Sequence, residues 1–376
     1  MYNVLNMAIL FSLVFLKNRK IKYYTIFSIL IMISPALITA LYWSDIRLLS
    51  VRSYLVLSLF LISISSFREI EKAVDVLSLL IIIMEVGAMI ALIFILVGYG
   101  PISSFPRPSS ISTLFVYPFS LSPFGGGIHE HIRLTSIYDE PGSFSFVICI
   151  IAYLRYALNK DSRITMVILF LGMSTFSLAH VIFIIAFYIL AGKKIDLNII
   201  SIVILPVLFI SLFYFTKFGS LIDRFIFNRF IISAAADQYF TGDNRSEMFF
   251  NGLEILLSDS KIWLLGVNQY NIDNYKINLG ENPLTPLIYN GILMSWTYYL
   301  YIILGSWISF KYKEYSFLAI ILLIIQRPYL DSFGYSLMLL LAFWAFLHKI
   351  NENKIKSKKF CKMSQVATVS PPAPLF

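Results

Sequence analysis

The sequence predicts an all-α fold, a polytopic transmembrane helical bundle of about 10–12 helices. Of the 376 residues, 58% are hydrophobic and 14% are charged, whereas a soluble domain carries roughly 25% charged residues. The apolar residues form continuous runs of about 15 to 25 residues, long enough to cross a hydrocarbon core of roughly 30 Å as helices. Strands would alternate apolar and polar residues, so these runs exclude strands as the main element. Backbone groups in lipid need internal partners, which helices supply.

The apolar runs define the expected membrane helices. They are 2–16, 23–43, 50–66, 75–98, 143–159, 164–177, 179–192, 198–216, 286–310, 315–326 and 334–348. Residues 164–192 fit either two short passes or one long tilted helix. Basic residues flank this stretch on both sides and favour an even number of crossings. We therefore expect a helical hairpin that turns near residues 177–180.

Clusters of lysine and arginine set the expected orientation, because short cytoplasmic loops are enriched in these residues. The clusters lie at 17–22, 68–72, 155–163, 193–194, 311–313 and 349–362. We place them in the cytoplasm, with 349–376 as a cytoplasmic tail and 1–376 as one integral membrane domain. The two long loops, 100–142 and 217–285, then face outward. Topology accounts for most of the net charge of +9, so no nucleic-acid partner is expected.

The first long loop ends in a charged segment directly before a predicted helix. Its residues 129–142 are HEHIRLTSIYDEPG. Pro141 suits the first turn of the helix, and Asp139 or Glu140 lies near the positive N-terminal end. The structural interpretation is an acidic helix cap beside an interfacial arginine, Arg133.

The second long loop is expected to be partly helical. The stretch from Ser246 to Leu257 has apolar residues at helical spacing and predicts an amphipathic helix near the membrane surface. Arg245 stands at the start of this helix, where the helix dipole disfavours a cation. A charge placed against local preference hints at an anionic partner. Arg224 and Arg229 precede it in the same loop.

Three other features have both a chemical and a structural interpretation. Glu85 lies inside an apolar run, where a carboxylate is expensive and marks a functional candidate, or a buried hydrogen bond to a neighbouring helix. His129 and His131 resemble half of a metal site, but no third ligand is evident, so no metal is expected. Cys149 lies in an apolar run and Cys361 in the tail, so we expect no disulfide.

The end of the first loop resembles a known signature. The segment Arg133-x-x-Ser-Ile-Tyr-Asp-Glu-Pro-Gly is similar to the Arg-x-x-Gly-x-Phe-x-Glu-Pro-Asn signature of bacterial O-antigen polymerases (the Wzy type) and O-antigen ligases. Ser136 stands in place of the family glycine, and Gly142 in place of the usual asparagine. A Ser-Thr-Phe-Ser turn at 174–177 follows one helix later, as in that superfamily.

The second loop continues the resemblance in the same order. An arginine-led helix at 245–257 is followed by Leu265-Gly266-Val267-Asn268, which resembles the family's Gly-x-Gly segment. Glu281-Asn282-Pro283-Leu284 resembles the family's His-Asn-x-x-Leu segment before the next membrane helix. The resemblance covers roughly residues 75–310. Glu281 stands where ligases carry histidine, which favours the polymerase over the ligase.

The resemblance implies an enzyme of the bacterial inner membrane with its active site facing the periplasm. Such enzymes transfer a growing sugar chain from undecaprenyl pyrophosphate onto a new lipid-linked repeat unit. The family is metal-independent and implies no cofactor, so arginines bind the diphosphate and stabilise its charge as it leaves. We assign Arg133 and Arg245 to this role, with Arg229 and Arg224 as further candidates.

A carboxylate has to accept the proton of the attacking sugar hydroxyl. Glu281 is the first candidate base, and Glu140 or Asp139 is the second. A single displacement inverts the anomeric configuration of the transferred sugar. The implied partners are the lipid-linked oligosaccharide, the bilayer and a chain-length regulator protein.

Two alternatives share the membrane topology. A lipid-linked oligosaccharide flippase or other transporter places its binding groups near the bilayer midplane, and Glu85 is the feature that favours it. An O-antigen ligase shares the scaffold but transfers the chain to lipid A core.

Overall fold

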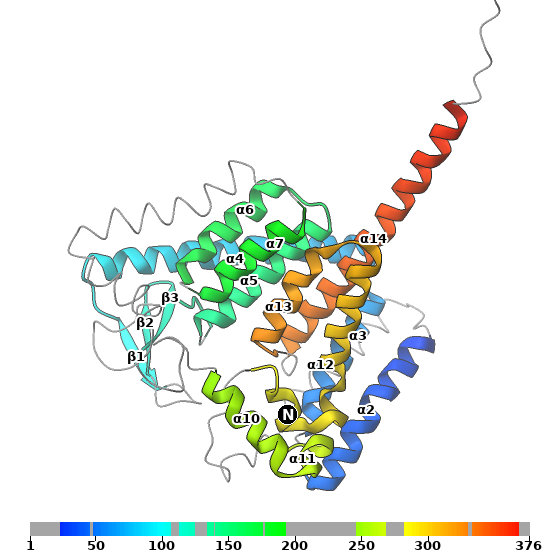
Figure 1. The fold of residues 1–376 in the computed structure, drawn as a ribbon. Helices are drawn as coiled ribbons and strands as arrows, with labels where there is room; N and C mark the ends of the chain where they lie inside the picture. The colour runs from blue at the N-terminus through cyan, green and yellow to red at the C-terminus, as the bar shows by residue number, and fades with distance from the viewer. Residues whose placement is uncertain are drawn as a thin grey trace, which may run out of the picture.

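A computed structural model describes most of the chain as a bundle of helices (Figure 1). The described residues are 23–45, 48–106, 113–124, 134–138, 140–175, 177–192, 246–267, 282–329 and 333–367. The described helices are α2 (Tyr23–Trp43), α3 (Leu48–Ile64), α4 (Phe67–Leu96), α5 (Pro141–Ala157), α6 (Ser162–Leu171), η1 (Gly172–Thr175), α7 (Leu178–Leu190), α10 (Ser246–Ser258), α11 (Ser260–Leu265), α12 (Thr285–Tyr312), η4 (Tyr315–Phe317), α13 (Leu318–Gln326) and α14 (Phe333–Ala367). The predicted helices 2–16 and 198–216 lie outside the described residues.

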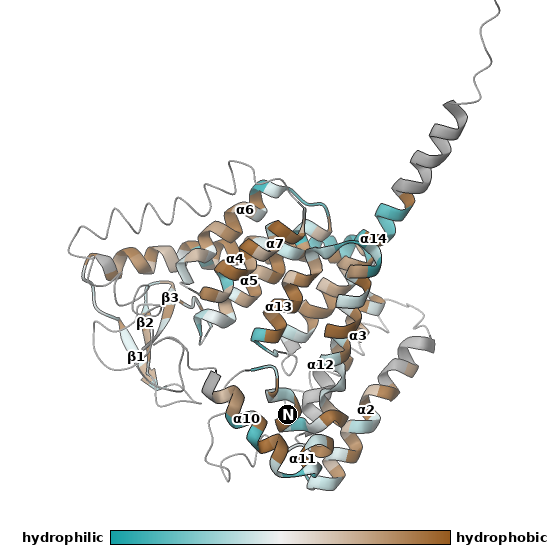
Figure 2. Cartoon of the chain, in the orientation of Figure 1, coloured by the Kyte–Doolittle hydropathy of each residue, from teal (hydrophilic) through white to brown (hydrophobic). Residues whose placement is uncertain are grey.

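Two of these helices are long and apolar enough to span a membrane. They are Phe67–Ile95, within α4, and Thr285–Tyr312, which is α12. The other apolar helices found in the described ranges are shorter, and Figure 2 shows that hydrophobic residues dominate the bundle throughout.

Helix α5 forms the centre of the bundle. Every residue from Pro141 to Arg155 is buried, and α4, α6, α7, α13 and α14 pack around it. A helix that is apolar all round belongs in an interior, because it has no polar face to present to water. The run from Phe144 to Leu154 therefore sits in the core, and the two ends of α5 carry the polar contacts.

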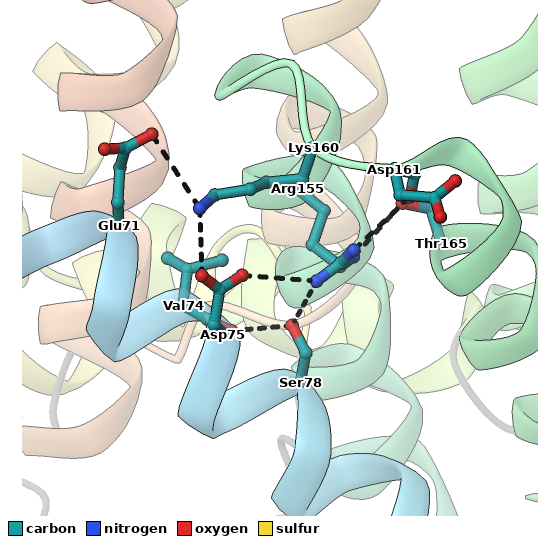
Figure 3. A network of polar contacts seen from close by, with 8 residues as sticks. All are labelled: Glu71, Val74, Asp75, Ser78, Arg155, Lys160, Asp161 and Thr165. Carbon is teal, nitrogen blue, oxygen red and sulfur yellow. Dashed lines mark hydrogen bonds and ion pairs between the residues drawn. The ribbon is translucent and has the colours of Figure 1, made fainter.

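A polar network joins α4, α5 and α6 at the C-terminal end of α5 (Figure 3). The buried guanidinium of Arg155 donates to Ser78 Oγ at 3.1 Å and to Thr165 Oγ1 at 3.3 Å. Lys160 pairs with Asp75 at 2.9 Å. We call this end of the bundle the basic end.

Residues from the C-terminal half of the chain also make polar contacts at this end. Lys349 of α14 pairs with Glu314 at 3.1 Å, and Asn159 donates to Glu352 at 2.9 Å. The predicted cytoplasmic clusters at 68–72, 155–163 and 311–313 thus lie at helix ends on this side, whereas 349–362 lies within α14 and has Lys349 at this end. The opposite end, formed by the starts of α5 and α12 and the end of α13, is called the loop end.

The first long loop contains a small sheet, so the all-α prediction is wrong for this segment. The strands β1 (Ser103–Pro106), β2 (Thr113–Tyr117) and β3 (Ser120–Phe124) form an antiparallel sheet in that order. β2 is rich in the aromatic and β-branched residues that suit strands. At the turn that follows, the Cβ of Phe119 lies so close to Gly87 that a Cβ added there would be 3.0 Å away. The sheet therefore packs on α4.

Most predicted helix boundaries agree with the structure, and two differ. α4 begins at Phe67 because Ser66 and Glu69 form a capping box. α14 continues to Ala367, so much of the predicted tail extends the last helix away from the bundle (Figure 1). The expected break is present, because one helix ends at Thr175 and the next begins at Leu178; that each of the two crosses the membrane stays a prediction. One continuous helix over 164–192 is therefore wrong.

Candidate functional site

The described part of the first motif, residues 134–138, docks on the edge strand β3. Leu121 N donates to Ser136 O at 2.7 Å, and Thr135 N donates to Leu121 O at 3.0 Å. Ser136 has φ +54°, in the left-handed region that favours glycine. This is the position at which the resembled signature carries glycine. The backbone here therefore has the conformation that a glycine would adopt at least cost.

Tyr138 connects this motif to the core. Its ring stacks on Phe144 of α5 with centroids 5.6 Å apart. Burial raises the pKa of the Tyr138 phenol above its usual value, so the group is neutral at physiological pH. The stack holds the end of loop one against the first turn of α5.

Glu140 occupies the N-cap position of α5, but its side chain makes no capping hydrogen bond. Its carboxylate instead accepts a hydrogen bond from Arg327 Nη1 at 2.8 Å. Glu140 is therefore the acidic residue at the start of the helix, as predicted, but its side chain does not cap the helix by a hydrogen bond. The residue pairs across 187 positions of sequence with a cation from the end of α13.

Arg327 is held in place by local sequence and by its neighbours. Pro328 follows it, and a residue before proline avoids the helical region, so α13 ends and Arg327 is extended. Its guanidinium also donates to the hydroxyl of Tyr329. The Tyr329 hydroxyl also shares a hydrogen bond of 2.9 Å with Ser143 Oγ.

Gly142 provides the space for this arrangement. A Cβ added at Gly142 would overlap the guanidinium of Arg327. The glycine found where the resembled signature has asparagine is thus matched to an arginine more than 180 residues away in the chain.

The motifs of the second loop gather around the first turns of α12. Asn282 accepts from Leu284 N at 2.8 Å, and its side-chain amide donates to the Met248 carbonyl of α10 at 3.4 Å. Val267 N donates to Ile288 O at 2.8 Å. α10 and α11 therefore sit on the loop end of α12.

Two glycines cross where α11 meets α12. Gly266 has φ +72° and Gly291 has φ +60°, and α12 is kinked at Gly291. A Cβ on either glycine would overlap the backbone of the opposite segment. The segment that resembles the family's Gly-x-Gly motif thus owes its glycine to a close backbone approach.

A further set of polar side chains lies deep in the bundle, away from the loop end. Glu85 of α4 is fully buried, and neither carboxyl oxygen has a hydrogen-bond partner among the described residues. Cys149 and His180 lie on the neighbouring α5 and α7, with Sγ and Nδ1 3.3 Å apart. His180 Nε2 faces the carbonyl of Leu169 at 2.8 Å, so Nε2 carries the hydrogen and Nδ1 accepts from the thiol.

The structure tests only part of the predicted site. Of the candidate residues, Glu140 is described, and it is brought together with Arg327 and Tyr329, which the sequence analysis missed. The remaining candidates lie outside the described residues; they are Arg133, Asp139, Arg224, Arg229, Arg245 and Glu281. Within the described ranges there is no group of three or more His, Cys, Asp or Glu residues that could hold a metal ion.

Comparisons with known proteins add no relative. No protein-family model, curated protein or solved structure matches the chain.

Proposed function

We propose that this chain is a membrane-embedded glycosyltransferase that polymerises undecaprenyl-pyrophosphate-linked repeat units into O-antigen or a related surface polysaccharide. The proposal places it as a multi-pass protein of the bacterial inner membrane, with its site facing the periplasm. The growing chain is transferred from its lipid carrier to a new lipid-linked unit.

One observation carries the proposal. Five short motifs spread over residues 133–284 resemble the superfamily in order. The described parts of four of them lie at the loop end of the bundle, whereas the turn at 174–177 packs against α5 deeper in the bundle. The motif at 134–142 leads into α5, and the motifs at 246–257, 265–267 and 282–284 surround the start of α12. The left-handed Ser136 supports the match at the position of the family glycine.

The chemistry follows from the proposed substrate. A hydroxyl of the new unit attacks the anomeric carbon of the growing chain, the carbon–oxygen bond to the diphosphate breaks, and the lipid diphosphate leaves. A carboxylate takes the hydroxyl proton, and arginines stabilise the leaving charge. We assign Arg133 and Arg245 to the diphosphate, with Arg229 and Arg224 in support.

The two ranked bases now differ in what supports them. Glu281 directly precedes Asn282, whose side chain joins α10 to α12. Glu140 stands at the first turn of α5, beside the guanidinium of Arg327. A residue that accepts a proton has to be ionised beforehand, and the arginine favours that state in Glu140.

A transporter is the second candidate, because of Glu85. A fully buried carboxyl that has no hydrogen-bond partner among the described residues, in a helix long enough to span a membrane, fits a group that binds substrate or protons near the midplane. The polar groups at the loop end favour the enzyme.

Reconstitution separates the two. Purified protein in liposomes with a lipid-linked repeat unit on the accessible face is expected to form polymer and to release undecaprenyl pyrophosphate. Movement of the unit across the bilayer without polymer would support the transporter instead. In the host, loss of the gene is expected to leave lipopolysaccharide capped with single repeats; loss of a ligase leaves no cap, and loss of a flippase blocks export.

Variants then test the assigned residues. Arg133→Lys keeps the charge but loses the planar fork that binds a phosphate through two hydrogen bonds, so we expect severe loss of polymer. Glu281→Gln and Glu140→Gln, compared under the same conditions, identify the base, because only the variant of the true base abolishes transfer. Normal polymer length in Arg133→Lys would remove that arginine from the mechanism.

A further inference from the structure

The pair of Glu140 and Arg327 is built more rigidly than a surface ion pair. The side chain of Arg327 is 13% exposed and that of Glu140 is 29% exposed. Two acceptors, the carboxylate and the Tyr329 hydroxyl, hold the guanidinium. Exposed ion pairs contribute little because their long side chains are mobile, whereas this cation is fixed at both acceptors.

Aromatic packing fixes the second acceptor. The ring of Tyr329 stacks on Tyr335 of α14 with centroids 4.6 Å apart and meets Phe146 of α5 edge-on at 5.2 Å. The hydroxyl is further tied to Ser143. Helices α5, α13 and α14 thus converge on one guanidinium.

The backbone beneath the guanidinium has no room for a side chain. Gly142 lies two residues after Glu140, and any Cβ there would collide with Arg327. The carboxylate, the arginine and the glycine therefore form one unit in which each position constrains the others.

We propose that Arg327 is a positioning residue for Glu140, holding the carboxylate ionised and oriented at the start of α5 so that it accepts a proton from the attacking hydroxyl. This inference rests on the proposed function. In the described segments Glu140 pairs with the guanidinium of Arg327. The phenol of Tyr329 contacts that same guanidinium, and Tyr138 lies two residues before Glu140. Arg327 is the cation among them and sets the ionisation of the carboxylate.

The sign of the effect follows from the charge. A guanidinium at hydrogen-bond distance favours the ionised carboxylate and keeps the base competent at lower pH. Without it, the carboxylate takes up a proton at higher pH, and the acid limb of the rate profile moves upward by roughly one to three pH units. A purely structural role would lower the rate at all pH values and leave the limb in place.

The experiment measures polymer formation against pH in proteoliposomes with a lipid-linked repeat unit. Arg327→Gln is expected to move the acid limb upward, and Arg327→Lys is expected to restore it in part. Gly142→Ala displaces the guanidinium without removing the charge and is expected to move the limb in the same direction. Gly100→Ala is the matched control, because a Cβ there meets nothing within 4 Å.

The outcomes separate this inference from the function on which it rests. No polymer from the wild type would overturn the proposed function itself. An active wild type with an active Glu140→Gln variant would overturn the role of Glu140. If Glu140→Gln is inactive while Arg327→Gln and Gly142→Ala keep the wild-type limb, the positioning role is wrong. Size-exclusion profiles in detergent show which variants are folded, and Gly142→Ala keeps the test decisive if Arg327→Gln is not.

Discussion

Replacing Ser78 by alanine is expected to destabilise the protein more than removing the charge of Asp75. Both residues contact the buried guanidinium of Arg155 at the basic end (Figure 3). Ser78 is 2% exposed and accepts a hydrogen bond of 3.1 Å. The side chain of Asp75 is 52% exposed and lies 3.7 Å from the guanidinium. The charge of Asp75 suggests the stronger contact with Arg155, but distance and burial give the larger contribution to the neutral hydroxyl of Ser78.

The expected losses of unfolding free energy differ because the Ser78 contact is buried, whereas the Asp75 contacts are exposed to water. Ser78→Ala leaves a buried donor of a charged group without its acceptor, which costs about 1–3 kcal/mol. Asp75→Asn weakens contacts that water already screens, worth about 0–1 kcal/mol. Ser63→Ala is the control, because that exposed hydroxyl bonds only to the Phe60 carbonyl of its own helix; we expect a change within about 0.5 kcal/mol.

The assay is reversible unfolding in mixed lipid–detergent micelles, followed by tryptophan fluorescence. The free energy of unfolding is compared between each variant and the wild type. A larger loss in Asp75→Asn than in Ser78→Ala would refute the reasoning, and so would a Ser78→Ala value equal to that of the Ser63 control.

Three further predictions concern other parts of the bundle. Glu85→Gln is expected to fold like the wild type, because a fully buried carboxyl to which no described residue donates a hydrogen bond is neutral; Glu85→Lys buries an unpaired charge worth several kcal/mol and is expected to leave little monodisperse protein in detergent. Gly291→Ala is expected to cost at least about 1–2 kcal/mol, because its φ is positive, whereas Gly334→Ala, which has open space, is expected to be neutral in the same unfolding assay. A membrane-impermeant maleimide is expected to label Cys361 in inverted vesicles and not in spheroplasts, and to spare the buried Cys149 in both; labelling of Cys361 in spheroplasts would reverse the proposed orientation.

Local sequence was sufficient where an element depends on its own residues. The helix expected at 23–43 is Tyr23–Trp43, and the one expected at 286–310 is Thr285–Tyr312. Pro141 begins α5, as its fixed φ predicts. The apolar run alone predicts a start at residue 75, whereas α4 begins eight residues earlier, because Ser66 and Glu69 form a capping box ahead of the run.

The contacts that build the site join residues far apart in the sequence, and the spacing of apolar residues does not predict such contacts. Glu140 was singled out for its place before a helix, but its partner Arg327 lies at the end of another helix. The sequence does carry a signal: an apolar run that ends in Gln326-Arg327-Pro328 indicates a helix that stops at a cation. The crossing of Gly266 and Gly291 depends on two backbones meeting, which neither local sequence predicts.

The burial of α5 from Pro141 to Arg155 has a consequence for how the protein is made. The ribosome completes this helix before α6, α7, α13 and α14, which later enclose it. Until α14 emerges, part of the α5 surface has only lipid or a chaperone to cover it. A chain that terminates after α12 is therefore expected to expose that surface and to be degraded, even though the two described helices long and apolar enough to span a membrane have already been synthesised.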